Sequence, residues 1–568
     1  MKIVENANNN FIIMKNLKLI LASSFFFIAS GIHAQSSFVE NAAKSIFTLT
    51  TFKSDGSILA SSHGIFIGTN GEAVADWKSF LGAKTAVVVD AEGRSMDVES
   101  IYGANELYDL CKFKVKGTKT HAATLATTPS ATGSKVFLMG YSIKKPQSRL
   151  MTVSGIEKFG DNLNYYNFDG TTPDNTNNCP FVNARGEVIG LMQISTTTTK
   201  VHATDVRIVS GLTTNGLTIS QPLMKKTGIR VTMPEKQQDA LLTLILSGEQ
   251  CDSATHAIYV NEFLQHFPTA TEGYSNKAQL EVRAANYANA DKIMNEALSK
   301  CTNKADVHSD YSKLVFDKAV YVGDSIYPAW NLDKALHEAE QAYAINALPA
   351  YRHQQAQIYF SKTDYKKAYD MFIDLSKNGM HNGEVFYEAA QCKAQLKANA
   401  DEILNLLDSA VAVCPQPLTQ AAAPYVLARG YQLDNMGKYR EALKDYFRYD
   451  TLMLGRVNDN FYYTRYKCET KIKQYQQALE DIARCILVNP REVTYYAEMA
   501  SLELRVKRYN QAIEVAERCT KLEPNYADAW LILGVAQREK GLKAEARTSL
   551  EKAKELGDKR AEEYLKNL

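Results

Sequence analysis

The sequence lacks an excess of charge of either sign, because its 568 residues carry 65 Lys and Arg against 63 Asp and Glu. A nucleic acid or an anionic membrane would favour a basic excess, so no nucleic-acid partner is predicted. The nine cysteines include no C-x-x-C pair, which excludes the usual zinc and thioredoxin-like motifs. We therefore expect no cofactor and no metal site, and cysteines that act mainly as small buried apolar side chains.

The sequence also lacks an apolar run of about 20 residues, the length that a membrane-spanning helix needs. The segment Leu19–Ile32 is shorter, follows two lysines, and ends just before Ala34, a small residue suited to cleavage. These are the parts of a secretory signal, although Ile32 stands where a small residue is usual. We expect residues 1–34 to be a signal peptide, with Met14 as an alternative start. The mature chain would then be periplasmic or secreted, without a membrane span.

Residues 36–220 are predicted to form β structure. Short apolar runs such as Thr85–Asp90 and Lys135–Tyr141 are separated by Gly, Asn and Asp turns, and residues 183–187 join two runs as a tight hairpin. Many short strands at close spacing are typical of a barrel or a sandwich. Residues 221–236 carry little pattern and are assigned to a linker.

From residue 237 to residue 568 the pattern changes to long helical periodicity with a repeat of 34 residues. Tyr462, Tyr496 and Trp530 are 34 apart, and Pro490 and Pro524 close two successive units. Four further positions, occupied mostly by small or apolar residues, recur at the same spacing of 34 residues. The pattern resembles the tetratricopeptide repeat family. Weaker copies upstream bring the total to eight or nine units, and a generic helical bundle would not keep this phase.

The resemblance to tetratricopeptide repeats also implies a binding face, because the first helix of each unit lines the concave groove in that family. Each residue of this face could equally be an ordinary surface residue, but as a set they combine rigid tyrosines with donors to carboxylates. We expect other polypeptides as partners, with an extended acidic segment in the groove. The residues carried over are Tyr387, Tyr431, Tyr463, Lys467, Lys471, Arg505 and Arg538.

Three segments of the β region share their residues and their order with a second family. Residues 62–79 read SHGIFIGTNGEAVADWKS, residues 109–115 read DLCKFKV, and residues 175–190 read NTNNCPFVNARGEVIG. They resemble, in turn, the catalytic-histidine strand end, the orienting-aspartate segment and the nucleophile loop of trypsin-like serine proteases, especially the periplasmic branch. The sequence thus predicts a multi-domain chain: an all-β trypsin-like double barrel, then an all-α tetratricopeptide solenoid.

The catalytic positions depart from the protease pattern. Lys78 occupies the position of the base, Asn177 that of the nucleophile, and only the orienting Asp109 remains. Asparagine has no nucleophilic oxygen of use here, and a protonated lysine cannot accept a proton. Asn175 and Asn178 replace glycines of the oxyanion loop, which makes its conformation harder to adopt. We expect a degenerate site in which Lys78 and Asp109 form an ion pair.

The sequence therefore predicts an exported protein-binding or scaffold protein whose protease-like domain is inactive. The alternative is an active extracytoplasmic endopeptidase with a non-standard site. In that case Cys179 would act as the nucleophile with His63 or His121 as its base, or Lys78 would act as an unusual base. A third possibility is that the barrel serves only as an N-terminal cap for the repeats.

Overall fold

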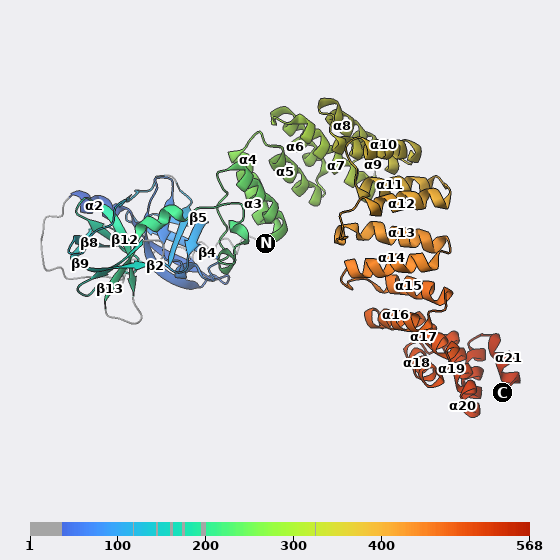
Figure 1. The fold of residues 1–568 in the computed structure, drawn as a ribbon. Helices are drawn as coiled ribbons and strands as arrows, with labels where there is room; N and C mark the ends of the chain where they lie inside the picture. Colours follow the sequence, from blue (N-terminus) through green and yellow to red (C-terminus); the bar gives the residue numbers. More distant parts are fainter. Residues whose placement is uncertain are drawn as a thin grey trace, which may run out of the picture. The chain divides into compact units, whose positions relative to one another are not determined.

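The computed structural model describes residues 37–117, 119–143, 146–159, 163–172, 176–194, 200–323 and 325–568. The chain divides into two compact units, of which the first ends at Pro268 and the second runs Thr269–Leu568. The first contains the strands and the second is helical (Figure 1). The expected signal peptide lies outside the described residues. Within those residues, no helix combines the length and the apolar character needed to cross a membrane.

The first unit opens with helix α2 (Ser37–Lys44) and a closed antiparallel barrel of six strands in the order β1-β2-β3-β6-β5-β4. Pairing of β1 with β4, for example Leu49 opposite Val88, completes the ring. Inward residues alternate with more exposed ones, and Phe47, Phe66 and Phe113 pack together in the interior. The strands are β1 (Ile46–Phe52), β2 (Ile58–Phe66), β3 (Glu72–Ala75), β4 (Thr85–Asp90), β5 (Ser95–Asn105) and β6 (Leu110–Val115).

A second sheet follows in the order β11-β8-β9-β10-β13-β12-β7, and pairing of β11 with β12 closes six of these strands into another barrel. Residues 183–187 form the predicted tight hairpin turn between β11 and β12, in which the Asn183 side chain accepts hydrogen bonds from the backbone N–H groups of Arg185 and Glu187. The double barrel expected from the sequence is therefore confirmed. The strands are β7 (Thr124–Leu125), β8 (Lys135–Gly140), β9 (Gln147–Phe159), β10 (Leu163–Phe168), β11 (Pro180–Asn183), β12 (Glu187–Ile194) and β13 (Val201–Asp205).

Residues 221–236, assigned to a linker from the sequence, run along the first barrel. Val231 forms a bridge with Ile101 of β5, and its carbonyl accepts a hydrogen bond from the buried Tyr259 hydroxyl. Arg230 forms ion pairs with Glu99 of β5 and with Glu262. Through these contacts the first helix pair, α3 (Gln237–Gln250) and α4 (Ser253–His266), packs within the unit that holds the barrels.

The second unit is a stack of antiparallel helix pairs followed by a short final helix (Figure 1). Small residues at the predicted repeat positions are fully buried, as Ala478, Ala512 and Ala546 show. Gly534 lies so close to Leu550 that an added Cβ would come within 2.7 Å of its side chain. The helices are α5 (Thr271–Arg283), α6 (Tyr287–Lys300), α7 (Lys304–Tyr321), α8 (Leu332–Ile345), α9 (Pro349–Ser361), α10 (Tyr365–Lys377), α11 (Gly383–Gln395), α12 (Ala400–Ala412), α13 (Ala423–Asn435), α14 (Tyr439–Leu452), α15 (Asp459–Lys471), α16 (Tyr475–Val488), α17 (Val493–Arg505), α18 (Tyr509–Leu522), α19 (Ala527–Glu539), α20 (Lys543–Glu555) and α21 (Arg560–Lys566).

Two successive repeats carry the same charged pair between their helices, partly buried in the first and fully buried in the second. Arg429 of α13 donates to both carboxylate oxygens of Asp445 on α14, and Arg465 of α15 does the same with Asp481 on α16. Bidentate pairing satisfies a guanidinium that is removed from water.

All nine cysteines are free and seven of them are buried, so they contribute as small apolar side chains.

Candidate functional site

The base and orienting positions of the protease-like site lie beside each other. Lys78 begins a short 3-10 helix, η1 (Lys78–Phe80), just after β3, and Asp109 stands in the turn before β6. The Asp109 carboxylate accepts a hydrogen bond of 2.9 Å from the Lys78 backbone N–H, and its other oxygen lies 3.3 Å from Lys78 Nζ. The ion pair expected from the sequence is therefore present. The lysine side chain is 74% exposed, so it lacks the desolvation that lysine bases require.

The nucleophile position, Asn177, lies in the loop before β11. Its carbonyl oxygen is 3.3 Å from Nδ1 of His63 on β2, and a proton on that nitrogen would make it the donor. Burial lowers the pKa of His63, against the opposing effect of this hydrogen bond. The imidazole nearest to this loop therefore contacts a backbone carbonyl, and a carbonyl carries no proton that a base could remove.

Asn178 shows how the loop turns without the glycine of the protease pattern. Its φ is 58°, in the left-handed region that asparagine tolerates better than most residues. The side chain is buried, and neither polar atom of its amide has a hydrogen-bond partner among the described residues. Replacing glycine by asparagine at this position therefore does not prevent the turn. Asn175, the expected oxyanion-loop residue, lies outside the described residues.

The alternative nucleophile, Cys179, is fully buried. Burial raises the pKa of its thiol to about 12, against a smaller opposing effect of the Tyr141 backbone. The reactive form of cysteine is the thiolate, so a thiol held in this state is unreactive near neutral pH. Of its two candidate bases, His63 contacts the Asn177 carbonyl, and His121 pairs at 3.1 Å with the exposed Glu92.

A buried carboxylate that the sequence did not single out holds the turn in front of Lys78. Asp76 accepts hydrogen bonds of 2.6 Å from the hydroxyls of Ser62 and Ser79, and a third from the Ser79 backbone. Burial raises the pKa of Asp76, and the two serine hydroxyls oppose that effect. All three side chains are buried, so the cluster fixes the junction of β3 and η1 rather than facing a substrate.

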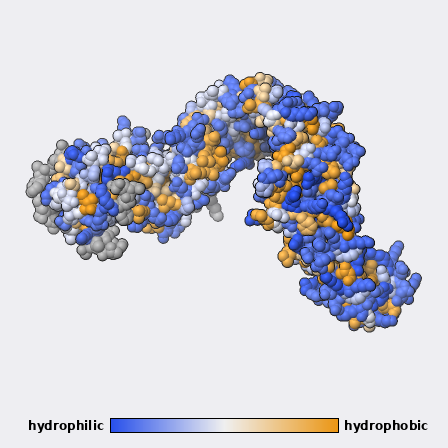
Figure 2. All heavy atoms as spheres, viewed as in Figure 1, coloured by the Kyte–Doolittle hydropathy of each residue, from blue (hydrophilic) through white to orange (hydrophobic). Residues whose placement is uncertain are grey.

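The predicted groove residues all lie on the first helix of their repeat. Tyr387 is on α11, Tyr431 on α13, and Tyr463 with Lys467 and Lys471 on α15, while Arg505 and Arg538 lie in the last turns of α17 and α19. On the face seen in Figure 2, hydrophobic residues lie in patches among hydrophilic ones over α11 to α15. The tyrosines have aromatic neighbours. The ring pairs are Tyr387 with Tyr425, Tyr431 with Tyr446, and Tyr463 with Tyr466 and Tyr495.

The basic groove residues differ in what they contact. Lys467 lies over the ring of Tyr463, 4.7 Å from its centroid, and Lys471 and Arg505 are exposed. Among the described residues, none of these three cations has an ion-pair partner. Arg538, in contrast, pairs with Glu539 and lies over the ring of Tyr564 on α21. Arg538 is therefore already paired, whereas, within the described residues, Lys467, Lys471 and Arg505 are not.

Comparison with known proteins supports the assignment of the helical unit. The family model described as tetratricopeptide repeat matches residues 493–526 and 527–556, which correspond to α17–α18 and α19–α20. The helical unit is a tetratricopeptide-like array. The remaining helix pairs extend it with the same alternation of first and second helices.

For the β unit, the matching solved structures include an HtrA-type protease, AlgW with a tripeptide. It is 18% identical, with a TM-score of 0.27, and the match covers 31% of this chain and 60% of that one. The trypsin-like assignment of the β unit rests on its two closed six-stranded barrels and on the three sequence segments quoted above. A search of curated proteins found no match.

Proposed function

We propose that this chain is an exported binding or scaffold protein. In this proposal the trypsin-like domain is catalytically inactive, and the tetratricopeptide-like array binds an extended acidic segment of another polypeptide. The observation that carries the first part is the pairing of Lys78 with Asp109. The orienting carboxylate holds an exposed ammonium where the protease mechanism needs an imidazole. Asn177 then offers no hydroxyl for such a base to activate.

The competing endopeptidase function would need another nucleophile. Cys179 is the candidate that the sequence offers, but the pKa of its buried thiol, about 12, keeps the thiolate scarce near neutral pH. Lys78 as a base has no hydroxyl at position 177 to deprotonate. These observations favour the inactive domain, and a hydrolysis assay with labelled casein decides between the two functions.

The second part of the proposal rests on the three exposed cations of α15 and α17. Lys467, Lys471 and Arg505 have no ion-pair partner among the described residues, so acidic side chains of a ligand could pair with them without displacing an internal partner. The partly exposed ring of Tyr463, stacked on the buried Tyr466, supplies rigid apolar area beside Lys467. Glu498 already accepts a hydrogen bond from the Tyr466 hydroxyl at 2.9 Å, which holds that ring in place.

Replacing Lys467, Lys471 and Arg505 together by alanine is expected to weaken binding of a fluorescein-labelled deca-glutamate peptide to the full-length protein roughly tenfold. Three exposed ion pairs at about 0.2–1 kcal/mol each give an effect of this size. Fluorescence anisotropy measures the affinity. The same affinity should fall steeply as the salt concentration rises, because exposed charges are screened over about 10 Å or less at physiological salt.

A matched control removes two lysines and one arginine from second helices instead, at Lys521 of α18 and at Lys543 and Arg547 of α20. These residues are exposed and lie off the proposed groove. Circular dichroism should show both triple variants folded. The groove assignment is wrong if both variants lose affinity equally, or if the groove variant binds as well as the unmodified protein.

A further inference from the structure

Three side chains that can bind a metal ion meet in the array, apart from the predicted groove residues and the protease-like site. His353 lies on α9, and Glu384 and Glu388 lie one turn apart on α11. Each offers one ligand atom, and the three atoms all lie within 4.8 Å of one another. In the part of the chain that the structure describes, no other three such side chains come this close.

The surroundings of the three side chains suit a bound ion. His353 Nε2 lies 2.5 Å from one oxygen of Glu388, and Gln357 donates to the other oxygen at 2.8 Å. The ring of Phe372 packs edge-on against the imidazole with centroids 5.7 Å apart. His353 and Glu388 are thus oriented by their neighbours and partly shielded from water, which strengthens electrostatic interactions at the site.

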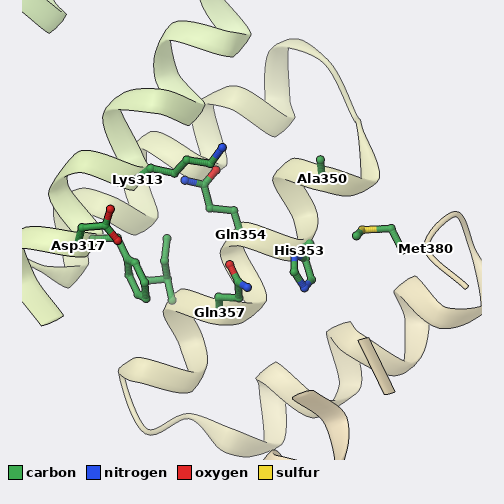
Figure 3. A pocket seen from close by; sticks show the side chains of 9 residues that line it. Lys313, Asp317, Ala350, His353, Gln354, Gln357 and Met380 are labelled. Carbon is green, nitrogen blue, oxygen red and sulfur yellow. The ribbon is translucent and has the colours of Figure 1, made fainter. Parts of the chain in front are cut away.

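A cavity of about 340 Å³ adjoins His353. Figure 3 shows Gln354 directed toward Lys313 and the His353 ring directed away from it. Glu384 is exposed, so the cluster is open to ions from solvent. The residues of α7 and α9 that line the cavity include Lys313, Phe316, Asp317, His353, Gln354 and Gln357.

We propose that His353, Glu384 and Glu388 bind a divalent transition-metal ion of the zinc class. One imidazole and two carboxylates supply three ligands and two negative charges, and the imidazole favours such ions over magnesium or calcium. The metal would take the place of the proton between His353 and Glu388, and three protein ligands leave a position for water. Sequence reasoning predicted no metal because the ligands come from two repeats and form no spaced motif.

A second histidine–glutamate pair shows why the third ligand matters. His308 Nδ1 lies 2.5 Å from Glu338, the same separation as in the proposed site. There, however, Lys334 pairs with the other oxygen of Glu338 at 2.6 Å. A cation contacts this pair, and among the described residues no second carboxylate joins it, so the pair should not bind a metal ion and serves as an internal control.

The test is titration of full-length protein with Co²⁺, followed by calorimetry and by visible absorption. We expect one ion per chain with nitrogen and oxygen ligands, and affinity at least roughly tenfold weaker in His353→Gln and in Glu384→Gln. His308→Gln should bind as the unmodified protein does. Glu384 is exposed, so its variant keeps the test valid if His353→Gln fails to fold.

Three outcomes would overturn the metal site. The first is unchanged Co²⁺ affinity in a folded Glu384→Gln variant. The second is an equal loss of affinity in His308→Gln. The third is an absorption spectrum with thiolate charge-transfer bands, which would assign the ion to one of the nine cysteines instead.

Discussion

Replacing Arg465 by alanine is expected to destabilise the helical unit by about 3–5 kcal/mol, the usual effect of breaking a buried ion pair. The guanidinium is fully buried and donates to both oxygens of Asp481, at 2.5 and 2.8 Å, and to Asp450 at 2.9 Å. It also lies over the ring of Phe447. Without Arg465, the buried Asp481 would lose its bidentate partner and keep only the half-exposed Arg484, and this loss of pairing accounts for most of the cost.

A neighbouring arginine provides the control for this prediction. Arg484 contacts the same carboxylate at 3.1 Å, but its side chain is 48% exposed. Arg484→Ala should therefore cost about 1 kcal/mol or less. Urea denaturation of the full chain, with hydrogen exchange at α15 and α16 to locate the effect, measures both variants. Equal losses for the two arginines would mean that burial does not set the strength of this pair.

Replacing Glu469 by glutamine is expected to stabilise the same region by about 3.5 kcal/mol at pH 7. The side chain is fully buried on α15, and neither carboxylate oxygen has a hydrogen-bond partner among the described residues. Burial, and then the charge of Asp481, raise the pKa of Glu469 to about 8, against the opposing charges of Arg465 and Arg484. The equivalent position two repeats later, 68 residues along the chain, is already a glutamine. This residue, Gln537, accepts a hydrogen bond from Ser549.

The sign of the pH dependence follows from this raised pKa. The carboxyl group ionises near its ordinary value of 4.5 in the unfolded chain but only near pH 8 in the folded one. Folding thus takes up a proton between these values, and stability falls as the pH rises from 4.5 toward 8. At about 1.4 kcal/mol per pH unit, the 2.5 pH units between 4.5 and 7 correspond to about 3.5 kcal/mol.

The free-energy difference between Glu469→Gln and the unmodified protein should therefore grow from pH 5 to pH 8. Urea denaturation at several pH values measures it. Glu514→Gln removes an exposed carboxylate that pairs with Arg518, and it should change the unfolding free energy by less than about 0.5 kcal/mol at every pH. A difference for Glu469→Gln that stays constant between pH 5 and pH 8 would contradict the raised pKa.

Much of this fold could be predicted from the sequence because its signals are periodic. The repeat of 34 residues located helix pairs, since small side chains recur where two helices pack closely. Strands with clear alternation, such as Thr85–Asp90, were predicted with the observed bounds. Strand β13 was not among the predicted strands because its residues, VHATD, do not alternate: all five are buried on one face or the other, polar ones included. Closure of a barrel can bury polar side chains that a local pattern assigns to the surface.

The protease-like site, too, could be predicted from the sequence only in part. The Lys78–Asp109 pair could be predicted because each residue lies at a fixed position within a recognisable protease-like segment. The Asp76 cluster and the Arg465–Asp481 pair could not, because they depend on which side chains of neighbouring elements face each other. No local spacing records that Asp76 lies under Ser62, or that an arginine on one helix meets an aspartate sixteen residues later.

The central claim, that the trypsin-like domain binds or supports rather than cleaves, is tested most directly by one hydrolysis assay. Purified full-length protein is incubated with fluorescein-labelled casein, and the release of labelled peptides is followed over time. The ion pair of Lys78 with Asp109, and the absence of a hydroxyl at Asn177, predict no release above the background without protein. Measurable turnover that is abolished by Asp109→Asn, Lys78→Ala or Cys179→Ser would contradict the account.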